Sequence, residues 1–220
     1  MVLPVQSQGV IHVQIKKHVT LIDSGGFSET PEFSKIMDDI TSSIKKVVHP
    51  PESDKFTIYP ESGKKRGKGN GVKPIKLNFI SHLVQRGWED VQNEKGKSSD
   101  KKSKRRNPGS HDAIYRIGDK CFAVEWETGN ISSSHRAINK MVLGILKGEL
   151  VGGALILPTR ELYRYLTDRI GNYEELEPYF DLWRVTPCRD GYLGIFAVQH
   201  DDTSYDVPRI PKGTDGRALQ

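Results

Sequence analysis

Residues 120 to 127 read KCFAVEWE, an apolar and aromatic run that carries two glutamates two positions apart. Successive side chains on a strand point to opposite faces, so Val124 and Trp126 share one face while Glu125 and Glu127 share the other. A strand this apolar is expected to be buried, and buried carboxylates require a partner. Two closely packed carboxylates repel each other, and one takes up a proton unless a cation relieves the repulsion. The pattern therefore raises the hypothesis of a metal site on a buried strand.

The second half of the chain alternates predicted strands and helices around this segment. Turn residues and periodicity predict strands at 111 to 117, 120 to 127, 151 to 158 and 191 to 198, and helices at 130 to 148, about 159 to 168, and 173 to 180. Alternation of this kind favours an α/β fold with a central mixed β-sheet flanked by helices.

The first half contributes further predicted elements to the same domain. Strands are expected at 10 to 22 and 55 to 60, a helix beginning at Thr30 and Pro31, and a second helix around 74 to 86. With 220 residues and 35% hydrophobic content, the chain is expected to form a single domain over residues 1 to 220. No apolar run approaches the roughly 20 residues of a membrane span and no leader pattern appears, which predicts a cytoplasmic protein without a membrane partner.

Positive charge is concentrated in two runs, GKKRGKGNG at 63 to 71 and KGKSSDKKSKRRNPG at 95 to 109, within a chain of formal net charge +5. Each run fits either a solvated, flexible loop or a segment that lies along phosphates. The first run lacks the Gly-Lys-Ser/Thr ending of a nucleotide-binding loop. Residues 207 to 220 are expected to form an irregular tail. The two cysteines, Cys121 and Cys188, have no second cysteine nearby, which argues against a disulfide framework or a zinc site.

Asp112 is expected to join the two glutamates. If Gly118 and Asp119 turn the chain between the two strands, residues equidistant from the turn face each other and Asp112 lies beside Glu125. Carboxylates at one end of a sheet suit Mg²⁺, which binds through one or two of them and through substrate phosphate. The alternative is a solvent-facing edge on which the glutamates pair with lysines. The following helix start, with Asn130, Ser132 and Arg136, suits phosphate and base edges.

These residues resemble a known nuclease core. Asp112 followed after a hairpin by Glu125-X-Glu127 is similar to the PD-(D/E)XK motif, with Glu127 where most members carry lysine. This variant resembles type II restriction endonucleases of the BamHI/OkrAI type. The similarity runs from about residue 69 to the C-terminus and is carried by these segments: GNGVKPIK (69 to 76), EWETGNISSSHRAINK (125 to 140), YLTDR (165 to 169), ELEPYF (175 to 180) and IPKGTDGR (210 to 217).

The resemblance implies a restriction-endonuclease-like fold and catalytic roles for particular positions. Asp112 and Glu125 would bind Mg²⁺, for which Mn²⁺ could substitute, together with the main-chain carbonyl of Trp126. Glu127 would be the general base that activates the attacking water. The family has a further acidic residue just after a tryptophan, and here Glu89, which follows Trp88, is favoured over Asp90 and Glu94.

The resemblance also implies how DNA is read. The residues that match the family's major-groove readers are Asn130, Ser132, Arg136, Asp168 and Arg169. These residue types suit adenine, cytosine and guanine edges. Further DNA contacts would come from Lys76, Asp215 and Arg217. The implied substrate is double-stranded DNA at the palindrome 5′-GGATCC, cut after the first G by a homodimer. A cognate DNA methyltransferase would accompany the enzyme functionally, without a physical complex.

Two departures from the family pattern stand out. His111 replaces the proline of the general motif, and Arg217 replaces a methionine in the tail, so tail contacts are expected to differ. Two other functions remain open on the sequence alone. One is a catalytically silent, sequence-specific DNA-binding protein, and the other is a structure-specific repair nuclease on the same core.

Overall fold

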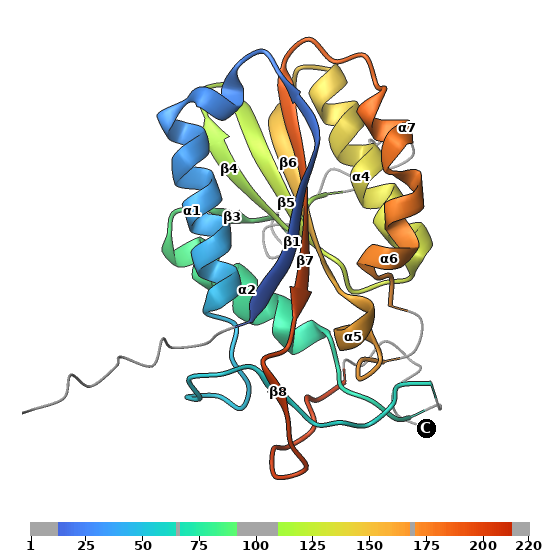
Figure 1. The fold of residues 1–220 in the computed structure, drawn as a ribbon. Coiled ribbons are helices and arrows are strands. Elements are labelled where there is room, and N and C mark those ends of the chain that lie inside the picture. The colour runs from blue at the N-terminus through green and yellow to red at the C-terminus, as the bar shows by residue number, and fades with distance from the viewer. Residues whose placement is uncertain (1–12, 65–66, 92–109, 168–169, 213–220) are drawn as a thin grey trace, which may run out of the picture.

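The computed structural model describes residues 13–64, 67–91, 110–167 and 170–212. Its centre is a six-stranded sheet in the order β1-β7-β6-β5-β4-β3 (Figure 1). The strands span Gln14–Ser24 (β1), Glu89–Asp90 (β3), Ala113–Ile117 (β4), Lys120–Trp126 (β5), Leu150–Pro158 (β6) and Gly191–Gln199 (β7). β5, β6 and β7 are parallel to one another, whereas β1, β4 and β3 are antiparallel to their neighbours. The sheet is therefore mixed, as predicted.

Helices cover both faces of this sheet (Figure 1). On one face lie α1 (Pro31–Lys45) and α2 (Lys73–Gln85), and on the other lie α4 (Ile131–Leu146), α6 (Tyr173–Leu176) and α7 (Phe180–Arg184). The remaining elements are the helix α5 (Arg160–Tyr163), the 3-10 helices η1 (Phe27–Glu29) and η3 (Glu177–Tyr179), and a small parallel pair of β2 (Thr57–Ile58) with β8 (Asp202–Thr203). The predicted α/β fold with a central mixed sheet is confirmed.

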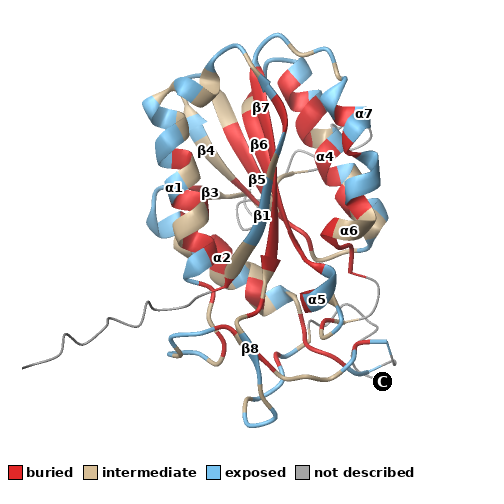
Figure 2. Cartoon of the chain, viewed as in Figure 1, coloured by how far each residue is buried: buried red, intermediate tan, exposed pale blue. Residues whose placement is uncertain are grey.

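Side-chain alternation on β5 divides the core into two layers. Phe122, Val124 and Trp126 pack with the apolar stripes of α1 and α2, whereas Ala123 packs with α4, α6 and α7. Figure 2 shows the buried residues concentrated on the sheet and on the inner sides of these helices. β5 lies between β6 and β4, so it is an interior strand, and Glu125 is on the face that α4 covers.

The longest elements begin and end close to where periodicity and capping predicted. Thr30 caps α1 by accepting the backbone N–H of Phe33 at 3.1 Å. The helix expected at 159 to 168 is shorter, since α5 ends at Tyr163, and the one expected at 173 to 180 is divided into α6, η3 and α7. The two-residue strand β3 is too short to show a periodic pattern. Within the described residues, no helix is long and apolar enough to cross a membrane.

Candidate active site

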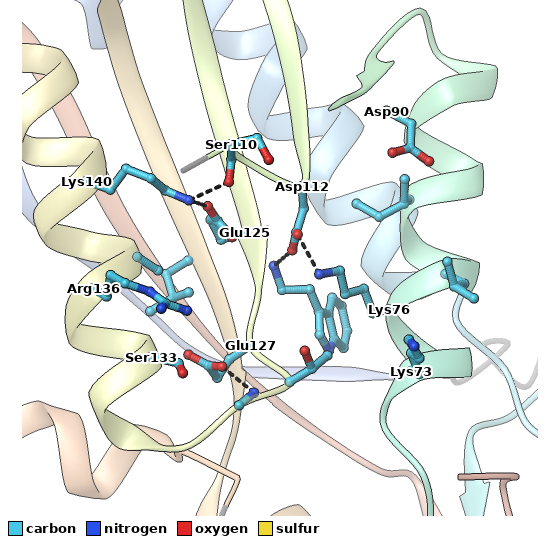
Figure 3. Close-up of a pocket in the computed structure, with 17 residues that line it drawn as sticks. Lys73, Lys76, Asp90, Ser110, Asp112, Glu125, Glu127, Ser133, Arg136 and Lys140 are labelled. Carbon is cyan, nitrogen blue, oxygen red and sulfur yellow. Dashed lines mark hydrogen bonds and ion pairs between the residues drawn. The ribbon is translucent and has the colours of Figure 1, made fainter. Parts of the chain in front are cut away.

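A pocket of about 430 Å³ lies where the end of β5 meets the beginnings of α4 and α2 (Figure 3). Charged side chains of both signs line it. Among the described residues, the acidic ones are Asp90, Asp112, Glu125 and Glu127, and the basic ones are Lys73, Lys76, Arg136 and Lys140. The pocket therefore brings together charged side chains of opposite sign from four separate segments of the chain.

Asp112 and Glu125 lie opposite each other, as the hairpin predicted. Ala113 pairs with Val124, and the next positions outward on β4 and β5 are these two residues. Asp112 is only 2% exposed. Its carboxylate accepts the backbone N–H of Trp126 at 2.9 Å and the Lys76 ammonium at 2.5 Å. Burial and then the neighbouring Glu125 carboxylate raise the pKa of Asp112, and this outweighs the opposing effect of Lys76.

Glu125 is held from the other side of the pocket. Its carboxylate forms an ion pair with Lys140 of α4 and a 3.2 Å contact with Nδ1 of His111. Lys140 also donates to the backbone carbonyl of Ser110 at 2.7 Å, which fixes the ammonium between the two segments. Burial alone would raise the pKa of Glu125, but His111 and Lys140 together lower it. Glu125 is therefore the more readily ionised member of the pair.

Glu127 follows β5 directly and turns toward the beginning of α4. Its Oε1 accepts the backbone N–H of Gly129 at 2.6 Å, and its Oε2 accepts the Ser134 hydroxyl at 2.7 Å. Burial raises the pKa of Glu127, and these two donors only partly offset the shift. A Cβ at Gly129 would lie 3.2 Å from Oε1 and closer still to Ser133, so the absence of a side chain at this position lets the turn close.

The pairing of Asp112 with Glu125 can be tested against the needs of a divalent cation. In the described part of the chain, no group of three or more His, Cys, Asp or Glu side chains is arranged to hold a metal ion. Asp112 and Glu125 do share the pocket, each with a lysine ammonium bound to it. Mg²⁺ typically uses one or two carboxylates and completes its shell with water and phosphate. The pair therefore fits such an ion, and the buried Trp126 lines the same pocket.

Asp90, and not the favoured Glu89, lines the pocket. Glu89 instead forms a two-pronged ion pair with Arg116 of β4, at 2.6 and 2.9 Å. Asp90 pairs with Ala113, next to Asp112, through the short strand β3. The sequence did not show which of these two neighbours lines the pocket, because a two-residue strand carries no alternation from which its facing could be inferred.

The beginning of α4 presents the predicted polar residues. Asn130 caps the helix through Oδ1, which accepts the Ser133 N–H at 3.1 Å, and both Asn130 and Ser132 are exposed. Arg136 is exposed and lines the pocket. Sequence reasoning missed Lys73 and Lys140 as pocket residues. Their spacing was a usable signal, since Lys73 precedes Lys76 by three positions and Lys140 follows Arg136 by four, placing each pair on one helix face.

Several predicted residues lie outside the described part of the chain. These are the expected base readers Asp168 and Arg169, the tail residues Asp215 and Arg217, and the basic segment 95 to 109.

A family model described as Restriction endonuclease BamHI matches residues 13–217. The chain is 47% identical over 208 residues to the type II restriction enzyme OkrAI of Oceanobacter kriegii, covering 94% of this chain and 100% of that protein. It is 36% identical over 184 residues to the type II restriction enzyme BamHI of Bacillus amyloliquefaciens, covering 81% and 80% of the two chains.

A solved structure of restriction endonuclease BglII complexed with a DNA 16-mer has a TM-score of 0.51 to this chain at 10% identity. The match covers 84% of this chain and 79% of that chain, and at such low identity it shows the fold alone. The family match and the two closely similar relatives cover the pocket and most of the sheet. The chain therefore belongs to the BamHI family of type II restriction endonucleases, which are site-specific deoxyribonucleases.

Proposed function

We propose that this enzyme cleaves double-stranded DNA at the palindrome 5′-GGATCC, after the first G, in a Mg²⁺-dependent reaction on a PD-(D/E)XK-type core. The observation that carries the proposal is the pair of buried Asp112 and largely buried Glu125, set opposite each other and balanced by lysines. The exposed start of α4 beside this pair supports DNA as the ligand, because helix N-termini and arginine attract phosphates and base edges.

Asp112 and Glu125 would hold the metal, with the main-chain carbonyl of Trp126 as a further ligand. Bound Mg²⁺ supplies Lewis-acid polarisation of the phosphodiester, and Mn²⁺ can supply the same chemistry. Lys76 and Lys140 each pair with one of the two carboxylates and orient it, and Lys140 together with His111 lowers the pKa of Glu125. Lys73 adds positive charge to the same pocket, which favours a phosphate there.

Glu127 would act as the general base. The N–H of Gly129 and the hydroxyl of Ser134 fix its two oxygens, and a carboxylate has further lone-pair sites that could take the proton of the attacking water. Burial raises the pKa of Glu127, which brings its basicity nearer to that needed at neutral pH. Asp90, rather than Glu89, would be the further acidic residue of the site.

Base recognition would come from Asn130, Ser132 and Arg136, together with Asp168 and Arg169. The Oδ1 of Asn130 caps α4 by accepting from both the N–H and the hydroxyl of Ser133. Lys76, Asp215 and Arg217 would add contacts to the DNA. The GGATCC assignment rests on the match of these residue types to the family's readers in the sequence.

A palindromic site calls for a protein with two-fold symmetry. Exposed apolar side chains on α4 and α7 support a homodimer through this surface: Leu143, Leu146 and Leu182, with Val185 just beyond α7. The two helices pack together, with the Trp183 indole donating to Asn139 at 2.9 Å. The dimer would act in the cytoplasm alongside a methyltransferase that protects the same sequence.

Digestion of a sequenced plasmid tests the proposal. The expected result with Mg²⁺ is a set of discrete fragments whose ends map after the first G of GGATCC, with no fragments in EDTA. Specific binding without cutting would indicate a silent DNA-binding protein, and nicking at no particular sequence would indicate a repair nuclease. Either result would contradict the proposal.

A further inference from the structure

The basic, glycine-containing run at 63 to 71 makes a set of buried contacts that neither a solvated loop nor a phosphate-binding segment explains. Residues 67 to 71, called here the junction loop, lie against two segments that are distant in the sequence. Asn70 belongs to this loop and is fully buried, with 0% exposure. An uncharged amide at such a position is informative, because every polar atom must find a partner within the protein.

Asn70 holds the segment 163 to 167 by both its backbone and its side chain. Its backbone N–H donates to the Tyr165 carbonyl at 2.7 Å, and its own carbonyl accepts the Thr167 N–H at 2.9 Å. Its Nδ2 donates to the carbonyls of Tyr165 and Tyr59, both at 2.8 Å. Asn70 also forms an isolated parallel bridge with Leu166. Asn70 therefore makes four hydrogen bonds here: three to Tyr165 and Thr167 of this segment, and one to Tyr59.

The same residue holds the segment 208 to 212. The Oδ1 of Asn70 accepts the Ile210 N–H at 3.1 Å, and the Gly71 N–H donates to the Ile210 carbonyl at 2.9 Å. A Cβ at Gly71 would overlap the Pro211 carbonyl oxygen, so only glycine allows this approach. Lys212 donates to the carbonyl of Lys68 at 2.5 Å and extends the contact along the junction loop.

A third set of contacts is made by Glu61, which precedes the junction loop in the chain. Glu61 accepts the Gly69 N–H at 3.0 Å and pairs with Arg209 at 2.7 Å, so one carboxylate spans the loop and the second segment. A Cβ at Gly69 would lie 2.8 Å from the Leu166 carbonyl oxygen. Gly69 and Gly71 therefore serve close backbone packing, Gly69 against the first segment and Gly71 against the second.

The two segments lead directly into the proposed DNA readers. Thr167 is followed in the chain by Asp168 and Arg169, and Lys212 is followed within five residues by Asp215 and Arg217. We infer that Asn70 is a positioning residue for base recognition: one buried amide fixes the two segments, 163 to 167 and 208 to 212, that directly precede the proposed readers in the chain. The inference rests on the proposed function. It assigns sequence discrimination to a side chain too buried to contact DNA.

The physical reason is geometric. Base readout requires side chains placed within a fraction of an ångström, and a displacement of about 1 Å at a site can lower rates by about a hundredfold. Asn70 makes the positions of the two segments depend on each other, since Nδ2 and Oδ1 belong to one planar amide. A change in this amide would therefore disturb both segments together.

Asn70→Asp is the sharpest test because it keeps the shape and the Oδ1 acceptor. It replaces Nδ2 with an oxygen that faces the Tyr59 and Tyr165 carbonyls without a proton to donate. The full-length variant is compared with wild type on short duplexes that contain GGATCC or the same site with one base changed. The ratio of kcat/KM between these duplexes is expected to fall at least about tenfold. The same ratio measured by competitive binding without metal is expected to fall in parallel.

Asp39→Asn is the matched control. Asp39 is a buried polar residue that binds Lys35, Arg86 and Trp88, none of which belongs to either segment. It is expected to lower the thermal midpoint and leave the ratio unchanged. The inference is overturned if Asn70→Asp keeps the wild-type ratio, or if Asp39→Asn lowers the ratio equally.

A second pair of variants decides the matter if Asn70→Asp does not fold. Gly71→Ala pushes against Pro211, whereas Gly67→Ala strains the backbone of the same loop, at a φ of +80°, with no atom of either segment within 4 Å of the added Cβ. Gly67→Ala therefore controls for strain in the loop that does not displace the segments. Loss of discrimination by Gly71→Ala alone supports the inference, and wild-type discrimination by Gly71→Ala overturns it. If wild type prefers another sequence, the GGATCC assignment fails and the ratio is measured on that sequence. If wild type prefers no sequence, the proposed function and the inference fail together.

Discussion

Glu125 is the side chain on which the proposed chemistry depends most directly. Glu125→Ala is expected to lower Mg²⁺-dependent cleavage by several kcal/mol of transition-state stabilisation, roughly a thousandfold in rate, because a metal ligand is lost. DNA binding is expected to persist or tighten, since the variant removes negative charge near phosphate and leaves Lys140 without its carboxylate partner. Single-turnover cleavage and a gel-shift titration measure the two effects, and cleavage at the wild-type rate would refute the assignment.

Asp90 and Glu89 offer a comparison of adjacent residues with the same charge. Asp90→Asn is expected to slow cleavage more than Glu89→Gln does, because only Asp90 lines the pocket while Glu89 is paired with exposed Arg116. Initial rates at saturating DNA over a Mg²⁺ titration provide the measurement. A larger loss from Glu89→Gln would restore the choice made from the sequence.

Helices α1 and α2 are joined by one buried carboxylate. Asp39 of α1 accepts from Lys35 at 2.6 Å, from Arg86 just beyond α2 at 2.9 Å, and from the Trp88 indole at 3.0 Å. Burial alone would raise the pKa of Asp39, but these three donors lower it below its usual value. A carboxyl group with a lowered pKa in the folded state stabilises the fold above its unfolded pKa, about 3.9. That stabilisation is lost as the pH falls through the lowered pKa.

Asp39→Asn is therefore expected to lower the free energy of unfolding by about 1 to 3 kcal/mol at neutral pH. The difference from wild type should shrink as the pH drops below about 4, because Asp39 then takes up a proton. Urea denaturation across this pH range measures the difference. Asp181→Asn is the control, since Asp181 pairs with Arg184 at an exposed position and should change stability by less than about 0.5 kcal/mol. An equal loss from both variants would contradict the role of Asp39.

The helical elements also mark the limit of prediction from local pattern. α1 and α4 were predictable because a capping residue begins each and an apolar stripe continues for several turns. α5 and α6 are single turns of four residues, each begun by its own cap, Thr159 and Asn172. Tertiary contacts dominate the stability of such short helices, so periodicity could not locate their ends.

The assembled enzyme is expected to be a dimer through the apolar surface of α4 and α7. Leu182→Lys with Val185→Lys should convert the dimer to a monomer, because these side chains are 65% and 77% exposed in one subunit and would meet their like charges across a two-fold axis. Sedimentation should show half the mass, and concerted double-strand cutting should be lost. Val84→Lys, at a 44% exposed position on α2, is the control and should stay dimeric. A wild-type monomer on DNA would contradict the expectation.

Much of the candidate site followed from the amino-acid order. The opposition of Asp112 and Glu125 could be deduced by counting outward from the Gly118-Asp119 turn, because hairpin pairing is a local rule. The layering around β5 followed from alternation along one strand. The roles of the family motifs came from resemblance, and those residues remain to be tested by substitution.

Local sequence specifies which segments become strands and helices, because alternation, capping and turn chemistry act over a few residues. It does not specify which distant side chains meet. The ammonium groups of Lys76 and Lys140 on the acidic pair, Asp90 in the pocket, and Asn70 between two segments all depend on packing across long stretches of chain. Burial requires each of these polar groups to find a partner, and only the closed tertiary structure determines which partner is within reach.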